Sequence, residues 1–177
     1  TLKLSMIDVY LNLILKMLIN PDQIVATGDE AEQLITDAIN YGTLCVSAEA
    51  VGCMESCYLK TVEYTKSREQ FGQPISNFQV LQHKMVDMFI EAELCKSLLY
   101  KSMIDMHENN DSKYRSVSAL KSQVGLSGKK VGEDAVQLHG GMGVSEEMSI
   151  GHYLKRFISI DSQFGNSHFH LKKFNNS

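Results

Sequence analysis

The chain has 177 residues, 44% of them hydrophobic, and a formal net charge of -4 at neutral pH. This length suits one compact domain, and the acidic balance without runs of like charge excludes a broad cationic surface for nucleic acid or an anionic membrane. Four cysteines without a C-x-x-C pair predict buried free thiols in a cytoplasmic or mitochondrial-matrix protein, and no apolar run reaches the length of a membrane span.

The first segment is rich in Leu and Ile and ends at a turn signal around Pro21. Its periodicity is ambiguous, but Leu11, Leu13 and Leu15 lie at alternate positions, which favours a short strand pair over a helix. We therefore expect residues 1–27 to be separate from the helical remainder.

Residues 30–66 lack proline and predict one long amphipathic helix that begins after a cap at residues 27–29. Its expected apolar stripe consists of Leu34, Ala38, Tyr41, Cys45, Ala48, Val51 and Tyr58. Ala48, Gly52 and Ser56 repeat a small residue at every fourth position, which would let another helix come close, within the chain or between chains. Cys53 and Cys57 share one face but lack the His or carboxylate companions of a metal site.

The stretch SREQFGQPISNFQ is a connector, because Gly72 and Pro74 break the helix and Asn77 can cap the next one. A second helix is expected from Phe78 to the polar stretch HENNDSK, with Leu81, Met85, Met88, Phe89, Ala92, Cys95, Leu99 and Met103 on its apolar face.

A third helix is expected from about Ser112 to a left-handed C-cap at Gly140-Gly141, with a buried face of Val117, Leu120, Val124, Val131, Ala135 and Leu138. A fourth should cover residues 146–160, and a short one should follow Gly165. The sequence therefore predicts an all-α, up-down four-helix bundle over residues 28–177, with a short β-strand remnant at the N-terminus.

Two stretches are more specific than a bundle requires. The connector carries Arg68, Phe71, Gly72 and Gln79, and the later break AVQLHGGMG carries Gln137, Gly140, Gly141 and Gly143. From about residue 30 to the C-terminus, their order and spacing resemble the C-terminal helical domain of the acyl-CoA dehydrogenase family. By that resemblance, residues 1–27 are the end of the family's middle β domain.

The resemblance implies that both stretches contact FAD, largely the adenosine and pyrophosphate portion held by a neighbouring subunit. The residues implied are Arg68, Phe71, Gln79, Gln137, Gly140 and Gly141. An arginine fork suits a pyrophosphate, and glycines without Cβ atoms allow an anion or a ribose to approach the backbone. His139 could reach a ribose or cap the helix. Taken alone, the glycines are a helix C-cap, Arg68 is a solvated residue and Phe71 is a plug beneath the turn.

Dehydrogenation of an acyl-CoA thioester also needs a carboxylate that accepts the Cα proton. At the two positions where family members carry this glutamate, the chain has Phe164 and Gly42. Asp161, Glu49 and Glu55 are nearby carboxylates, each more simply an exposed or capping residue. His168 and His170 should diverge on a helix, so no metal site is proposed.

Two hypotheses stay open. The chain is the C-terminal domain of an FAD-dependent dehydrogenase that acts on acyl-CoA, passes electrons to an acceptor and assembles through the bundle as a homo- or hetero-oligomer. Alternatively, it is a non-catalytic partner subunit of a heteromeric dehydrogenase, in which the companion chain supplies the acid. A third reading, a helical bundle unrelated to flavins, has only the bundle pattern in its support.

Overall fold

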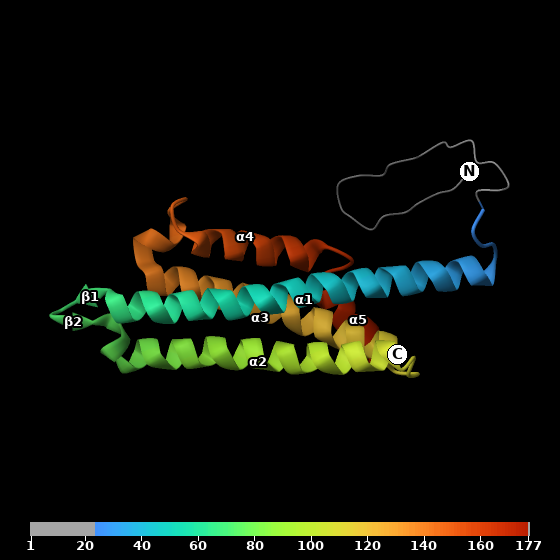
Figure 1. The fold of residues 1–177 in the computed structure, drawn as a ribbon, viewed down its shortest axis with the longest axis horizontal. Coiled ribbons are helices and arrows are strands. Elements are labelled where there is room, and N and C mark those ends of the chain that lie inside the picture. Colours follow the sequence, from blue (N-terminus) through green and yellow to red (C-terminus); the bar gives the residue numbers. More distant parts are fainter. Residues whose placement is uncertain (1–23, 177) are drawn as a thin grey trace.

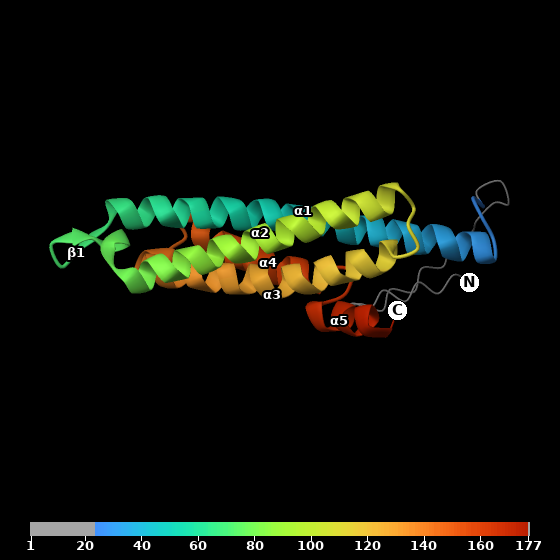
Figure 2. The ribbon, with the colours of Figure 1, turned by 90° about the horizontal axis from the view of Figure 1, so that it is seen from below.

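The computed structural model describes residues 24–176, which form an antiparallel helical bundle. Its helices are α1 (Asp29–Ser67), α2 (Gln79–His107), α3 (Lys113–His139), α4 (Ser149–Ser162) and α5 (Ser167–Asn176). Successive long helices reverse direction, and α5 packs across the bundle near the end where α2 meets α3 (Figures 1 and 2). The predicted all-α bundle is confirmed, whereas the N-terminal strand pair lies outside the described residues and, like the division at residue 27, stays a prediction.

Helix α1 buries only part of the apolar stripe that the sequence predicts: Val51 is buried, and Ala48 and Tyr58 are half-buried. Leu34, Tyr41 and Cys45 are exposed, and its buried positions include Thr43, Ser47, Ala50, Met54, Cys57, Thr61 and Thr65. The buried hydroxyls bond within the helix: Thr43 Oγ1 donates to the Ile39 carbonyl at 2.7 Å, and Ser47 Oγ donates to the Thr43 carbonyl at 2.7 Å. Because such bonds satisfy the hydroxyls, small polar residues can occupy a core face.

Helices α2 and α3 follow their predicted faces more closely. All six predicted core residues of α3 are buried, as are Met88, Ala92, Cys95 and Leu99 of α2, while Phe89 and Met103 are exposed. Asn77 does not cap α2, since the N-cap residue is Phe78 and no side-chain cap bond forms. Asn77 instead ends a short 3-10 helix, η2 (Ile75–Asn77).

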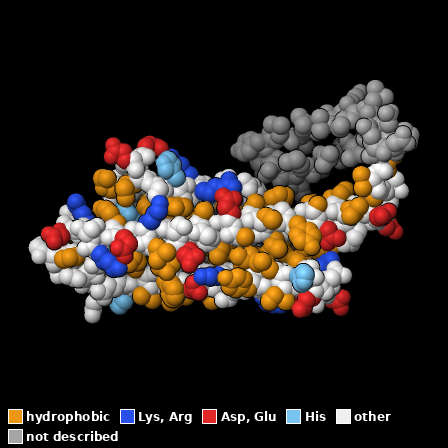
Figure 3. All heavy atoms as spheres, in the orientation of Figure 1, with side chains coloured by type: hydrophobic (Ala, Val, Ile, Leu, Met, Phe, Trp, Pro, Cys, Tyr) orange, Lys and Arg blue, Asp and Glu red, His pale blue; other side chains and the backbone are white. Residues whose placement is uncertain are grey.

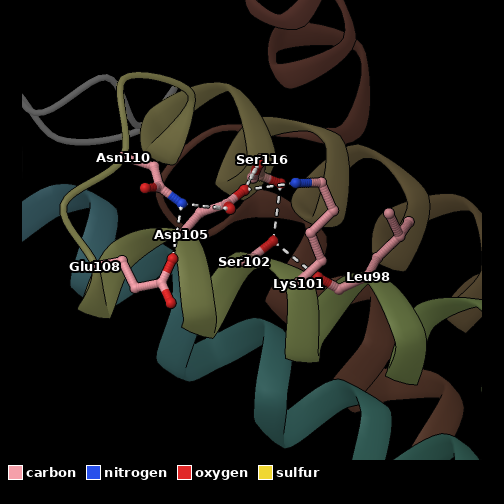
Figure 4. A network of polar contacts seen from close by, with 7 residues as sticks. All are labelled: Leu98, Lys101, Ser102, Asp105, Glu108, Asn110 and Ser116. Atoms are coloured by element: carbon pink, nitrogen blue, oxygen red, sulfur yellow. Dashed lines mark hydrogen bonds and ion pairs between the residues drawn. The ribbon is translucent and has the colours of Figure 1, made fainter.

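The turn between α2 and α3 is closed by a polar network (Figure 4). The Asp105 carboxylate accepts hydrogen bonds from the Ser116 hydroxyl, from Asn110 Nδ2 at 3.1 Å and from Lys101 Nζ at 2.8 Å. These donors lower the pKa of Asp105 to about 2, with Lys101 the largest contributor. The carboxylate is buried but fully paired, so it fixes this end of the bundle at little electrostatic cost.

Glycines let α4 lie close against α3. A Cβ atom added at Gly132 would lie 2.9 Å from Leu154 Cδ1 and 3.2 Å from Leu154 Cα, and one added at Gly128 would lie 3.1 Å from Phe157 Cδ1. By contrast, a Cβ at Gly52 would have no neighbour within 4 Å. The close helix approach within the chain therefore occurs on α3, and the predicted small-residue seam on α1 has no intrachain partner at Gly52.

Hydrophobic side chains remain on the surface of α1 and α2 (Figure 3), and those of α2 include Val86, Phe89, Ile90 and Leu94. Residues 24–176 contain no helix that is both long enough and apolar enough to cross a membrane. All four cysteines are free: Cys57 and Cys95 are buried as predicted, Cys53 is half-buried, and Cys45 is exposed, contrary to that prediction.

Candidate functional site

The connector after α1 is a two-stranded hairpin, which the sequence did not predict. Strand β1 (Glu69–Gln70) pairs antiparallel with β2 (Gln73–Pro74), and the turn between them consists of Phe71 and Gly72 with φ of 56° and 78°. Positive φ at both central residues gives the turn twist that closes a two-residue hairpin. The hairpin is anchored to α1, because the Arg68 amide donates to the Tyr64 carbonyl at 2.9 Å.

The side chain of Phe71 is 90% exposed at the hairpin tip, so it is not a plug beneath the turn. Its only ring contact among the described residues is an edge-on approach to Phe78 at 6.1 Å between centroids. A non-glycine residue in the left-handed region is strained by about 1–2 kcal/mol. Neither packing among residues 24–176 nor backbone preference therefore accounts for a phenylalanine here.

Arg68 is exposed beside this hairpin. Its guanidinium makes no ion pair with any carboxylate of residues 24–176, whereas nearby Lys66 pairs with Glu63 at 2.8 Å. Gln79, the first residue of α2, is also exposed. The side chains of Arg68, Phe71 and Gln79 are thus available to an external group.

The predicted glycine break ends α3, with a geometry that differs from the expected left-handed cap. Gly140 has φ 58° and ψ -137°, and a 3-10 helix, η3 (Gly140–Val144), follows it. This ψ lies outside the left-handed helical region, in a part of conformational space that glycine occupies far more easily than other residues. Gly140 and Gly141 are exposed, and a Cβ added at either would meet nothing within 4 Å.

Tyr64 connects the two predicted stretches, which lie at the same end of the bundle (Figure 1). Its ring stacks on that of His139 at 4.2 Å, and its hydroxyl donates to the His139 carbonyl at 3.4 Å. His139 is only 3% exposed, and its Nδ1 lies 2.8 Å from the Ala135 carbonyl oxygen, to which it must donate. Burial lowers the pKa of His139, so this interior imidazole is neutral.

Residues 33–172 match the family model for the C-terminal domain of acyl-CoA dehydrogenases. The chain belongs to the acyl-CoA dehydrogenase family. Acyl-CoA dehydrogenase IpdE2 of Mycobacterium tuberculosis is 32% identical over 130 residues, which are 72% of this chain and 39% of that protein.

Among solved structures, PigA with FAD and proline has a TM-score of 0.74 and 25% identity over 78% of this chain and 36% of that one. The Tcur3481-Tcur3483 steroid ACAD has a TM-score of 0.74 and 26% identity over 77% and 38%. The chain thus spans less than half the length of each of these relatives.

The structure brings together Gly42 and Phe164, the two residues that the sequence analysis compared, by resemblance, with the family's glutamate positions. A Cβ added at Gly42 would lie 2.7 Å from Phe164 Cζ and 2.9 Å from Phe164 Cε1, so the phenyl ring lies directly on the backbone of α1 at Gly42. Phe164 has φ 57° and is 46% exposed. The phenylalanine and the glycine that the sequence analysis singled out are therefore in contact, and neither can act as an acid or a base.

The nearby carboxylates are already engaged in other interactions. Glu49 receives a two-pronged hydrogen bond from Arg156, at 2.6 and 2.7 Å, which lowers the pKa of Glu49. Glu55 pairs with Lys96 at 3.4 Å, and Asp161 accepts a hydrogen bond from the Ser167 amide at 2.9 Å. Each thus has a structural partner, as the sequence reading of exposed or capping carboxylates suggests.

On α5, His168 is exposed and His170 is buried, so the two side chains diverge as predicted. Within the described part of the chain, no three His, Cys, Asp or Glu residues come together as a possible metal site. The sequence analysis did not identify Tyr64 or the buried Lys121, which is described below. A lysine within the apolar face of a predicted helix was the available signal for Lys121.

Proposed function

We propose that the chain forms the C-terminal domain of an FAD-dependent acyl-CoA dehydrogenase, and that its hairpin end completes an FAD site held mainly by another subunit. The observation that carries this proposal is Phe71, which is strained in its backbone and almost wholly exposed next to the unpaired Arg68. The hairpin turn requires the positive φ but not a phenylalanine, and an exposed aromatic ring at such a position supports contact with a ligand or partner.

The residues at this end fit the adenosine and pyrophosphate portion of FAD. The planar guanidinium of Arg68 can donate two parallel hydrogen bonds to a pyrophosphate, and the exposed ring of Phe71 offers a stacking surface. Gly140 and Gly141 leave open space beside the C-terminal end of α3. This helix end presents carbonyl groups and negative dipole, so we assign it to ribose hydroxyls rather than to phosphate.

The separation of the two features on α1 supports a site shared between subunits. Gly42 and Arg68 are about 26 residues apart, which corresponds to about 39 Å along a helix. One extended dinucleotide is too short to reach from the hairpin end to the Phe164 position. The hairpin end would therefore serve the flavin of another subunit, and the hydrophobic side chains exposed on α2 fit such an assembly.

When bound, FAD supplies the acceptor for the hydride that leaves Cβ of the thioester. Removal of the Cα proton needs a base, and neither Phe164 nor Gly42 can accept a proton. The contact between Phe164 and Gly42 favours a second candidate function. The chain would be a partner subunit of a heteromeric acyl-CoA dehydrogenase in which the companion chain carries the acid. A structural relative that pairs two components, Tcur3481 and Tcur3483, agrees with that candidate.

Flavin binding tests the first proposal. In the assembled protein containing this chain, Arg68→Ala should weaken FAD binding about 10-fold to 100-fold, because charge-assisted hydrogen bonds are worth about 1.5–3 kcal/mol. FAD released on denaturation measures the flavin content. Lys66→Ala is the matched control, since Lys66 is a nearby cation already paired on the surface. Unchanged FAD affinity in both Arg68→Ala and Phe71→Ala would refute the proposal.

Turnover separates the two candidate functions. The protein alone is mixed with an acyl-CoA and an artificial electron acceptor, and then again with a companion chain that carries the glutamate. A partner subunit is inactive alone and active in the mixture. Activity of the isolated protein would eliminate the partner-subunit function and leave a dehydrogenase with an unrecognised base.

A further inference from the structure

Lys121 is a lysine with no exposed surface in the middle of α3. Within residues 24–176 it forms no ion pair with a carboxylate. Its ammonium group instead donates to three backbone carbonyls, those of Ile160 at 2.9 Å, Asp161 at 3.0 Å and Gly165 at 2.9 Å. An ammonium has three N–H donors, so this set uses all of them.

The three carbonyls belong to the end of α4 and the loop that follows it. Ile160 and Asp161 lie in the last turn of α4, where the helix dipole is negative, and the Ile160 carbonyl also accepts a hydrogen bond from the Gln163 amide at 3.2 Å. Gly165 lies in the loop before α5. Lys121 therefore joins the end of α4 to the loop and fixes the path of the chain between them.

This loop has an unusual backbone, with two consecutive residues at positive φ: Phe164 at 57° and Gly165 at 99°. The carbonyls of both residues are held from outside the loop. Lys121 donates to that of Gly165, and His170 Nε2 lies 3.0 Å from that of Phe164. Since a phenylalanine at positive φ is strained, these external bonds stabilise that backbone conformation.

The Phe164 ring is not held by burial, because 46% of its surface is exposed. It nevertheless lies so close to α1 that a Cβ at position 42 would be 2.7 Å from Phe164 Cζ, so a larger residue there would displace the ring. An exposed ring with few contacts can turn away from the helix unless its backbone is fixed. The backbone bonds of the loop therefore determine where the ring lies.

We infer that Lys121 is a positioning residue, which holds the loop after α4 so that Phe164 covers α1 at Gly42. The position of the family's acid then presents an apolar ring that suits the hydrocarbon part of an acyl group and cannot accept a proton. This consequence for the acyl site rests on the proposed function, whereas the placement of the ring by Lys121 does not.

Fluorescence tests the inference without FAD or substrate. The chain has no tryptophan, so Phe164→Trp introduces a single indole whose emission reports its surroundings. In this background, Lys121→Met keeps the side-chain length but removes all three donors. We expect a red-shifted emission and stronger quenching by acrylamide, while the far-ultraviolet circular dichroism stays helical. Gly42→Ala, which forces the ring off α1, provides the reference for a displaced ring.

Lys129→Met is the matched control, because Lys129 lies on the same helix with 62% of its side chain exposed. It should leave both emission and quenching unchanged, and Lys121→Arg, which keeps donors, should restore part of the signal lost in Lys121→Met. A folded Lys121→Met protein with the emission and quenching of its parent would overturn the inference. So would equal changes in Lys129→Met.

A pH titration keeps the inference testable if Lys121→Met does not fold. Burial lowers the pKa of Lys121 to about 8, against an opposing effect of Asp161 on α4. The other titratable groups facing this site are His170 and Lys173 on α5, and burial lowers the pKa of His170 to about 4. Deprotonation of Lys121 removes one donor, so quenching of the indole should rise from about pH 7 to about pH 9. A flat profile over this range would overturn the inference.

Discussion

Alanine substitutions at two glycines test the packing of the bundle, because one glycine is crowded and the other is open. At Gly132 a new Cβ would lie 2.9 Å from Leu154 Cδ1 and 3.2 Å from Leu154 Cα, so α3 and α4 would have to separate. At Gly52 a new Cβ would meet nothing within 4 Å. Both glycines lie inside helices, so the intrinsic preference for alanine is the same at both sites.

Alanine is favoured over glycine in a helix interior by about 1 kcal/mol, and Gly52→Ala should therefore stabilise the chain by about that amount. Overpacking a close contact costs about 1–3 kcal/mol, so Gly132→Ala should destabilise the chain by a net amount of about 1 kcal/mol. The free energies of unfolding of the two variants should then differ by about 2 kcal/mol. For a chain of this size, that difference corresponds to roughly 4–8 °C in Tm.

Urea unfolding followed by circular dichroism measures both variants, at a chain concentration where light scattering shows the same oligomeric state for each. A Gly132→Ala protein as stable as Gly52→Ala would refute the close approach of α3 and α4. Destabilisation by Gly52→Ala would mean that another chain packs at Gly52, as the predicted seam of small residues on α1 allows.

Two further predictions follow from side-chain environments. The pKa of Asp105 is lowered to about 2, so the ionised carboxylate contributes fully to stability above the ordinary pKa of 3.8. This contribution is lost as the pH falls from 3.8 toward 2. In urea unfolding, Asp105→Asn should therefore lose less stability over that pH range than the parent chain. Burial raises the pKa of Cys57 to about 12 and of Cys95 to about 11. Because the thiolate is the reactive form, iodoacetamide should modify the exposed Cys45 first in the native protein. Early labelling of Cys57 would contradict its burial in the core.

The helices could be predicted from the sequence because long stretches without proline repeat apolar residues at helical spacing. This method found the buried face of α3 but only part of that of α1, where Val51 is buried as predicted while the core also includes Thr43 and Ser47. A count of apolar residues cannot detect hydroxyls satisfied by the carbonyl one turn earlier. The hairpin at Phe71-Gly72 was also missed, because its first turn residue is neither Asn, Asp nor Gly, the residues that usually mark such a turn.

For the candidate site, the sequence identified residues of interest but not the contacts between them. The resemblance to the family singled out Phe164 and Gly42 as two separate departures, and nothing in their spacing showed that they touch. Their contact depends on the path of the loop after α4, which Lys121 determines from a helix about 40 residues earlier in the chain. Long-range hydrogen bonds to backbone carbonyls cannot be predicted from the periodicity of residues in a sequence.

Residues at the two ends of α1 can be substituted independently of each other. This explains why the chain can keep Arg68 and Phe71 for FAD and yet carry no acid at Phe164. A protein that lacks the acid would have no reason to keep Arg68 and Phe71 for its own reaction. Under the proposed arrangement, however, Arg68 lies about 39 Å along the helix from Gly42, which Phe164 contacts, and the hairpin end serves a flavin whose acid belongs to another subunit. Loss of the acid at Phe164 then removes one reaction centre while the hairpin end still supports the other.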